Sequence, residues 1–270
     1  MVRMSTKSGK KGRRIGVTDY HLHTKYSHDS KADLEEYAVK AIEMGMDAIC
    51  FTDHLDFNQR SPGYGNYSPE GFFEELAMIK KKYGDKLVIC AGAEVGEPHV
   101  YGKELSEIYQ YPYDFILGSM HWYGDLYFGK DLAEKYSIKE FYSIYWGEIL
   151  KAVKQGGIDA LAHIDLPKRF FQDIYYEEKV LKEIFKCMIE KEIALEINTS
   201  FVRKGIGKKL LPGEMLEIYR DCGGKYITIG SDAHQVQDLG TAYQQARSLA
   251  QKYDLQEVIF KERIKKPILI

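Results

Sequence analysis

The sequence predicts an α/β fold, a distorted (β/α)7 TIM-like barrel of parallel strands. Apolar, strand-like runs alternate with helical patterns along the chain, and no shift of composition marks a domain boundary. Such alternation is typical of a parallel sheet covered by helices, and seven units favour a barrel with irregular closure. A doubly wound open sheet shows the same alternation, but no glycine-rich phosphate fingerprint follows the first strand. The predicted strands cover residues 15–23, 47–54, 87–94, 115–121, 160–165, 194–200 and 226–234.

Several segments between these strands carry signals for the start of a helix. Ser137 with Glu140 forms a capping-box pattern, and Ser68 precedes a proline that suits a first helical turn. Ser30 with Asp33 resembles a second capping box, and apolar residues then keep helical spacing with charges on the opposite face. We therefore expect helices after the first, second and fourth strands.

Length and composition suit one large domain. The chain has 270 residues with 44% hydrophobic content, enough for a sizeable core, and we predict a single barrel domain over residues 15–270. Residues 1–14 are basic and lack an apolar stretch, which predicts a flexible tail and no secretory signal. A net charge of −2 disfavours a general nucleic-acid binder, and no apolar run is long enough to cross a membrane.

The four cysteines indicate a reducing compartment. Cys50, Cys90, Cys187 and Cys222 lie far apart without a CxxC pair, and the first two fall in apolar strand-like runs. Buried, reduced thiols in a cytoplasmic protein are the expected arrangement, with a single disulfide as the alternative.

Histidines and acids gather at the ends of the predicted strands, beginning with the stretch DYHLHT. Its two histidines are one residue apart and therefore share one face of an extended strand. An isolated histidine is more often a core or rim residue, but six of the eight end predicted strands, and His28 and His99 lie just beyond strand ends. Imidazoles and carboxylates without paired thiolates suit zinc, manganese or iron in an open catalytic site, on the face where barrel strands converge. The six are His21, His23, His54, His121, His163 and His234.

These motifs, taken in order, resemble the polymerase and histidinol phosphatase (PHP) family. The ordered set is DYHLHT, SHDS, FTDH, GAEVGE, GSMH, LAHID and IGSDAH, and it runs from about Gly16 to Tyr243. The flanking text, LEINTSFVRKG included, is most similar to the histidinol-phosphate phosphatase branch of that family. The resemblance implies a distorted (β/α)7 barrel that holds up to three divalent metal ions.

The resemblance also implies nine metal ligands, carried over motif by motif. Glu94 is expected to bridge two ions, and His28 is the alternative to its neighbour Asp29 at the third ion. The implied sets are His21, His23, Glu94 and Asp232 for the first ion, Glu94, His121 and His163 for the second, and His54, His234 and Asp29 for the third.

The implied chemistry is hydrolysis of a phosphate ester without a covalent enzyme intermediate. A bridging carboxylate lets two cations sit about 3.5–4 Å apart, as in two-metal hydrolases. A water held between them loses a proton near neutral pH and becomes the nucleophile, while the remaining ion grips phosphate oxygens. The substrate of the branch is L-histidinol phosphate, in histidine biosynthesis.

Three basic residues near strand ends are candidate phosphate ligands. Arg203 lies in the text that resembles the phosphatase branch, and Lys168 and Arg169 follow the fifth strand. An arginine fork matches phosphate oxygens, although loop cations are often only solvated. Asp53, beside His54, is a candidate either to fix an imidazole, which we favour, or to protonate the leaving alkoxide.

Other functions share parts of this pattern. A PHP-type phosphoesterase for nucleotides or other small phosphate esters would need the same metals. A noncatalytic metal-binding module is disfavoured, because all nine ligand positions hold competent residues. A metal-dependent amidohydrolase often carries a carbamylated lysine on a middle strand, and no lysine ends a middle strand here. We expect a small phosphate ester as the partner, and neither nucleic acid nor membrane.

Overall fold

The computed structural model describes residues 16–171, 174–205 and 210–268. The basic tail predicted for residues 1–14 lies outside the described residues, as does Ile15, the first residue of the predicted barrel domain.

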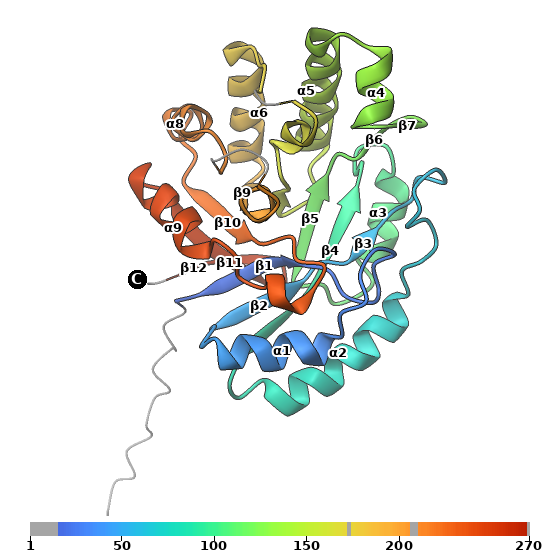
Figure 1. Ribbon diagram of the computed structural model, residues 1–270, viewed down its shortest axis with the longest axis vertical. Helices are drawn as coiled ribbons and strands as arrows, with labels where there is room; N and C mark the ends of the chain where they lie inside the picture. Colours follow the sequence, from blue (N-terminus) through green and yellow to red (C-terminus); the bar gives the residue numbers. More distant parts are fainter. Residues whose placement is uncertain (1–15, 172–173, 206–209, 269–270) are drawn as a thin grey trace, which may run out of the picture.

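A mostly parallel sheet forms the centre of the molecule (Figure 1). Its strands run in the order β1-β2-β4-β5-β8-β9-β10-β11-β12, β3 pairs with β4, and only β11 and β12 pair antiparallel. A separate short hairpin joins β6 to β7. The strands are β1 Thr18–Leu22, β2 Ala48–Phe51, β3 His54–Leu55, β4 Val88–Gly96, β5 Phe115–Ser119, β6 Trp122–Tyr123, β7 Leu126–Tyr127, β8 Ala160–Leu161, β9 Ala194–Asn198, β10 Tyr226–Gly230, β11 Gln256–Lys261 and β12 Ile264–Pro267.

β1 and β10, the first and seventh strands in this order, meet near their C-terminal ends. One parallel bridge links Leu22 to Ala233, and the amide of His23 donates to the Ala233 carbonyl over 2.9 Å. At the opposite end of β1, the Thr18 hydroxyl donates to Glu257 of β11 over 2.6 Å. The predicted α/β, TIM-like class is confirmed. Between β1 and β10, the described residues form one bridge, where a regular barrel would have a ladder.

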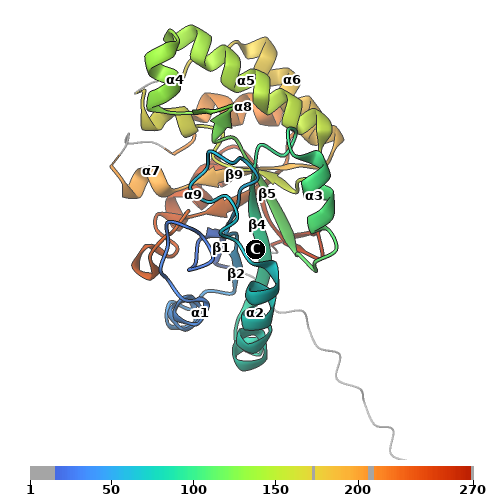
Figure 2. The ribbon, with the colours of Figure 1, turned by 90° about the vertical axis from the view of Figure 1, so that its right-hand side faces the viewer.

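Helices surround the strands on the outside (Figures 1 and 2). Ser68 accepts from the Gly71 amide at the start of α2, and Ser137 with Glu140 closes a capping box on α5, as predicted. The helices are α1 Leu34–Glu43, α2 Pro69–Tyr83, α3 Gly102–Ile108, α4 Lys130–Lys135, α5 Ile138–Gln155, α6 Glu178–Glu190, α7 Ser200–Arg203, α8 Gly213–Asp221 and α9 Tyr243–Lys252, with short 3-10 turns η1 Leu166–Arg169 and η2 Val236–Asp238.

The cap of α1 differs from the one expected. Asp33 is the N-cap residue and forms a capping box with Glu36. The Ser30 hydroxyl instead donates to two backbone carbonyls at the metal-competent end of the barrel, those of His23 and His234, each over 3.0 Å. Ser30 therefore ties the ends of β1 and β10 together and takes no part in the helix.

Two apolar layers fill the structure. The larger core lies between the strands and the surrounding helices, and a smaller one fills the interior of the sheet. Small residues of the parallel strands, such as Ala48 and Ala160, leave room there for three aromatic rings. These are Tyr20 of β1, Phe115 of β5 and Phe260 of the β11–β12 hairpin. The Tyr20 hydroxyl donates to the Phe260 carbonyl over 3.0 Å, which fixes the hairpin against the inner strands.

All four cysteines are free thiols. Among the described helices, none combines the length and apolarity needed to span a bilayer.

Most strands are shorter than predicted at their C-terminal ends. β8 contains only Ala160 and Leu161, so His163 lies beyond it, and β10 ends at Gly230, before Asp232 and His234. His163, Asp232 and His234 therefore occupy the bends after their strands, where the backbone can turn side chains toward a common centre. His21, His54 and Glu94 lie within β1, β3 and β4.

Candidate metal centre

Glu94 of β4 lies at the centre of a cluster of imidazoles. Its Oε1 is 2.8 Å from His163 Nε2 and 3.4 Å from His121 Nε2. Its Oε2 is 3.0 Å from His54 Nδ1 and 3.5 Å from His21 Nε2. One carboxylate thus faces nitrogens from four different strand ends, the arrangement expected of a bridging ligand.

Side-chain contacts orient His21 of β1 and His23, the residue that follows β1. His21 Nδ1 lies 2.7 Å from Glu196 Oε1, and His23 Nδ1 lies 3.0 Å from the Ser27 hydroxyl. These contacts leave both Nε2 atoms toward the cluster, only 3.0 Å from each other. Two fully buried imidazole nitrogens that face each other at this distance, each within 3.6 Å of Glu94, suit a shared cation.

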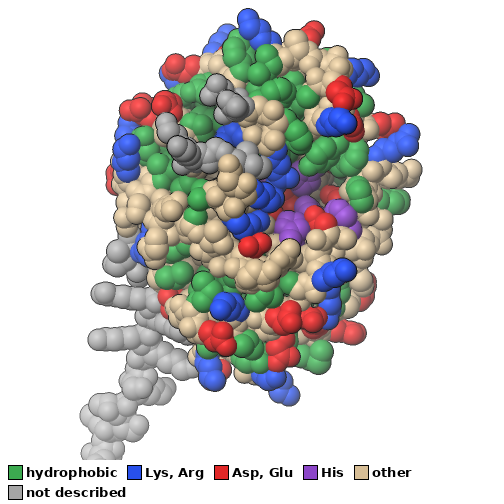
Figure 3. All heavy atoms as spheres, in the orientation of Figure 1, with side chains coloured by type: hydrophobic (Ala, Val, Ile, Leu, Met, Phe, Trp, Pro, Cys, Tyr) green, Lys and Arg blue, Asp and Glu red, His purple; other side chains and the backbone are tan. Residues whose placement is uncertain are grey.

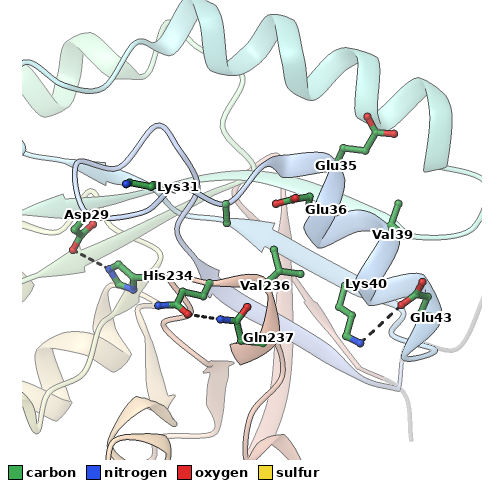
Figure 4. Close-up of a pocket in the computed structure, with 12 residues that line it drawn as sticks. Asp29, Lys31, Glu35, Glu36, Val39, Lys40, Glu43, His234, Val236 and Gln237 are labelled. Atoms are coloured by element: carbon green, nitrogen blue, oxygen red, sulfur yellow. Dashed lines mark hydrogen bonds and ion pairs between the residues drawn. The ribbon is translucent and has the colours of Figure 1, made fainter.

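A second group lies nearer the surface. Asp29 Oδ2 is 3.0 Å from His234 Nε2 and 3.7 Å from His54 Nε2. Figure 4 shows Asp29 pointing at His234. Both residues also line an outer groove along α1. His28 lines the inner cleft but does not belong to this group, so the geometry favours Asp29 over its neighbour.

Asp232 lies on a strained turn beyond β10. Its φ of 53° is in the left-handed region that disfavours non-glycine residues. The turn brings Oδ1 to 3.5 Å from His23 Nε2 and 4.0 Å from His21 Nε2, while Oδ2 is 3.3 Å from Arg169 Nη2. A strained residue held toward a cluster of imidazoles is consistent with a functional position.

The acids of the cluster are held in their charged form. Burial opposes ionisation of Glu94, but the surrounding imidazoles outweigh it and keep its pKa well below the usual range. The same balance lowers the pKa of Asp29 and of Asp232. Burial, followed by the neighbouring imidazoles, lowers the pKa of His23. Burial opposes the charged form of His21 and His54 as well, but nearby carboxylates outweigh it and raise the pKa of both imidazoles. The carboxylates are thus in the form that binds metal ions, whereas His21 and His54 would release a proton when an ion binds.

Several nitrogen and oxygen atoms here have no hydrogen-bond partner. Glu94 Oε2 and His54 Nδ1 are both buried and lie 3.0 Å apart, but neither forms a hydrogen bond within the described residues. Unpaired buried polar atoms are costly, and a cation that both atoms contact would remove the cost. The groups with ligand atoms close enough to hold one ion are His23, Asp29, His54 and His234; His21, His23 and Glu94; and His54, Glu94 and His121.

All nine predicted metal ligands come together in this cluster. The contacts overlap more than the predicted division among three ions, since His23 and His54 each approach two groups. The residues present fit divalent ions held by imidazole nitrogens and carboxylate oxygens.

The predicted basic residues take different positions. Arg169 lies beside the cluster, and its buried Nε has no partner among the described residues. Arg203 donates to the carbonyls of Ser231 and Asp232 over 3.0 and 3.1 Å, so it fastens the turn that carries Asp232. Lys168 is buried and its Nζ lies 2.7 Å from Asp165 Oδ2.

Asp53 is fully buried and bonds to the segment that follows β1. Its oxygens accept from the amide and hydroxyl of Thr24 over 2.5 and 2.8 Å and from the Ser27 hydroxyl over 2.8 Å. Burial raises its pKa. Because Ser27 also contacts His23 Nδ1, Asp53 acts on a cluster imidazole through one hydroxyl.

Three further buried acids support the cluster, and sequence reasoning assigned them no role. Glu196 holds His21 and also accepts from the His163 amide over 2.7 Å. Glu97 accepts from the His121 amide over 2.6 Å, and Asp19 accepts from the Ser231 amide over 2.9 Å. Burial raises the pKa of Glu97 to about 8 and that of Asp19 to about 6. The sequence offered a signal for each: Glu196 is an acid within a predicted strand, Asp19 begins the motif DYHLHT, and Glu97 ends the motif GAEVGE.

The cluster opens into a cleft of about 860 Å³. Figure 3 shows histidine side chains in a hollow, with lysine and arginine side chains along one edge. Arg169, Arg203 and Lys204 form a basic wall, which follows β8 and β9, whereas His28, Asp56 and Ser61 line the cleft from the segments after β1 and β3. Trp122 and Tyr127 of the β6–β7 hairpin add aromatic surface.

Comparisons with known proteins agree with this geometry. The PHP domain family model matches residues 19–200. A probable histidinol-phosphatase of Clostridium acetobutylicum is 33% identical over 268 residues, which cover 93% of this chain and 99% of that protein. The histidinol-phosphatase of Lactococcus lactis is 29% identical over 250 residues, 89% of this chain and 92% of that protein. A crystal structure of the Lactococcus lactis histidinol phosphate phosphatase, in complex with zinc, L-histidinol and phosphate, matches with a TM-score of 0.82 at 26% identity, over 93% of this chain and 98% of that one.

Proposed function

Because this chain belongs to the PHP family, we propose that it is a metal-dependent phosphomonoester hydrolase that acts on L-histidinol phosphate. The observation that carries the proposal is the cluster around Glu94, where one charged carboxylate faces imidazoles from four strand ends. The basic wall of the same cleft supplies a site for a phosphate group beside the cluster. Relatives that cover nearly the whole chain and are described as histidinol-phosphatases support this substrate.

We assign up to three divalent ions to the nine ligands, with zinc, manganese or iron as the candidates. Bound there, such ions would supply Lewis acidity and an activated water for in-line attack on phosphorus. The nine are His21, His23, Asp29, His54, Glu94, His121, His163, Asp232 and His234.

The remaining residues bind and orient. Arg169, with its unpaired Nε and a planar fork, is the best placed cation to contact phosphate oxygens. Arg203 keeps the Asp232 turn in place, and Asp53 keeps the turn after β1 in place. Lys168, paired with Asp165, steadies the segment that carries Arg169.

Phosphate release from L-histidinol phosphate tests the function directly. The protein loaded with manganese should cleave this ester faster than nucleoside monophosphates or a generic aryl phosphate. His121→Ala should lose the activity, because it removes a ligand on one side of Glu94. Equal low rates on all esters would refute the substrate but keep phosphatase chemistry, and metal-independent rates would refute the mechanism.

A further inference from the structure

Asp56 lies in the cleft without the partners that a buried carboxylate needs. It follows the two-residue strand β3, only 7% of it is exposed, and its Oδ1 has no hydrogen-bond partner among the residues that the structure describes. Its Oδ2 accepts from the Ser61 hydroxyl over 2.5 Å. In the part of the chain that the structure describes, no lysine or arginine pairs with it. The imidazoles of His28 and His54 are near enough to interact with its charge, but within the described residues neither forms an ion pair with it. A buried carboxylate without an ion-pair partner is costly, which favours a bound cation beside it.

The backbone around Asp56 is shaped to hold the carboxylate. A Cβ on Gly63 would lie 2.6 Å from Oδ2, and a Cβ on Gly96 would lie 3.0 Å from Oδ1. Any larger residue at Gly63 would also approach His28 Nδ1, at 2.9 Å. Because neither glycine has a side chain, the Asp56 carboxylate fits between the loop at Gly63 and the end of β4 at Gly96. There it lines the wall of the cleft together with His28 and Ser61.

The position of Asp56 relative to the metal cluster restricts what the missing cation could be. Asp56 lies two residues after His54, whose Nδ1 is 3.0 Å from Glu94. The basic wall that suits phosphate follows β8 and β9, whereas Asp56 follows β3, next to β4 in the sheet. A ligand with its phosphate at the cluster would thus meet Asp56 with groups attached close to the phosphorylated carbon.

The substrate of the proposed function carries such a group. In L-histidinol phosphate, a protonated primary amine is attached to the carbon next to the phosphorylated carbon. We propose that Asp56 binds this ammonium group and thereby selects amino-alcohol phosphates over esters that lack the amine. The inference rests on the proposed function for its ligand, and a charge-assisted N–H···O bond supplies the selectivity.

The test compares two esters that differ only in the amine. They are L-histidinol phosphate and 3-(imidazol-4-yl)propyl phosphate, each assayed for kcat and KM with manganese-loaded wild type and Asp56→Asn. In the variant, we expect the preference for the amine-bearing ester to fall at least about tenfold, mainly through KM, because a hydrogen bond to a charged group is lost. Activity on the ester without the amine should change by less than about threefold.

Two variants sharpen the comparison. Asp131→Asn is the matched control, because Asp131 lines the same cleft but is exposed, and it should keep the preference. Ser61→Ala removes the hydroxyl that fixes Asp56 Oδ2 and should reduce the preference by a smaller factor. It also keeps the inference testable if Asp56→Asn fails to fold, since an unchanged preference in Ser61→Ala would then overturn it.

The possible failures are distinguishable. If the wild type does not favour L-histidinol phosphate over nucleotides and aryl phosphates, both the proposed substrate and the role of Asp56 are refuted. If the wild type favours that ester but cleaves the form without the amine equally well, only the Asp56 inference falls. An equal loss on both esters in Asp56→Asn, with reduced manganese content, would assign Asp56 to metal retention and overturn ammonium binding.

Discussion

Glu196→Gln tests whether the metal cluster depends on acids that never contact an ion. Glu196 is 1% exposed and holds two cluster residues at once, through His21 Nδ1 at 2.7 Å and the His163 amide at 2.7 Å. A glutamine keeps the shape but loses the charge, and its amide nitrogen can face the donor on His21. Loss of such an outer partner of a metal-bound histidine typically costs roughly 10–100-fold in metal affinity or activity. That range corresponds to about 1.4–2.8 kcal/mol of binding free energy.

Manganese titration of the metal-free protein, with a competing chelator and phosphate release as readouts, measures this change. The midpoint for Glu196→Gln should shift to higher free manganese, with activity largely recovered at saturation. Glu257→Gln is the matched control, because Glu257 is also buried but bonds to Thr18 and Tyr243 at the N-terminal ends of the strands. An unchanged midpoint in Glu196→Gln would refute the orienting role, and an equal shift in both variants would indicate general destabilisation.

Three further predictions follow from the same structure. Arg169→Lys should lower kcat/KM for the phosphate ester by about 10–100-fold, because the planar fork beside Asp232 is lost, and steady-state kinetics with phosphate as a product inhibitor would show it. Removal of divalent ions by a chelator should lower the melting temperature, since ions at about a hundredfold excess over Kd contribute about 2.7 kcal/mol of stability, and calorimetry with and without added manganese measures it. Burial raises the pKa of Glu257, so the folded protein holds this proton more tightly than the unfolded chain, and its contribution to stability is lost as pH rises through the raised pKa. Urea unfolding from about pH 4 to pH 7 should therefore show Glu257→Gln gaining stability relative to wild type, and parallel curves would contradict the shift.

The alternation of strands and helices was readable from the sequence because each parallel strand is buried on both faces. Such strands appear as short apolar runs, and seven of them were located. The ligands were readable because their motifs end those runs. The C-terminal ends of most strands were predicted several residues too far along the chain. At β8, for example, the backbone leaves the sheet after Leu161, before the ligand His163.

The β11–β12 hairpin gave no comparable signal. Its turn places Glu262 and Arg263 at φ values of 53° and 60°, where glycine, asparagine or aspartate is usual in a two-residue turn. A tertiary contact stabilises the turn instead, because Arg263 Nε lies 3.0 Å from Asp159 Oδ2 and its amide donates to the Asp114 carbonyl over 2.9 Å. Those partners are more than a hundred residues away in sequence, beyond the reach of local patterns.

Acids at the strand ends have two different roles, which sequence position alone does not separate. One set accepts from backbone amides in the turn after a neighbouring strand and so fixes the turns that carry the ligands. Glu94 differs: within the described residues its ion pairs are with imidazole nitrogens, and Oε2 has no hydrogen-bond partner there. An acid whose oxygens already accept from backbone amides has less capacity for an ion, which agrees with Asp53 as a support for the turn after β1. The amide-accepting pairs are Asp19 with Ser231, Asp53 with Thr24, Glu97 with His121, and Glu196 with His163.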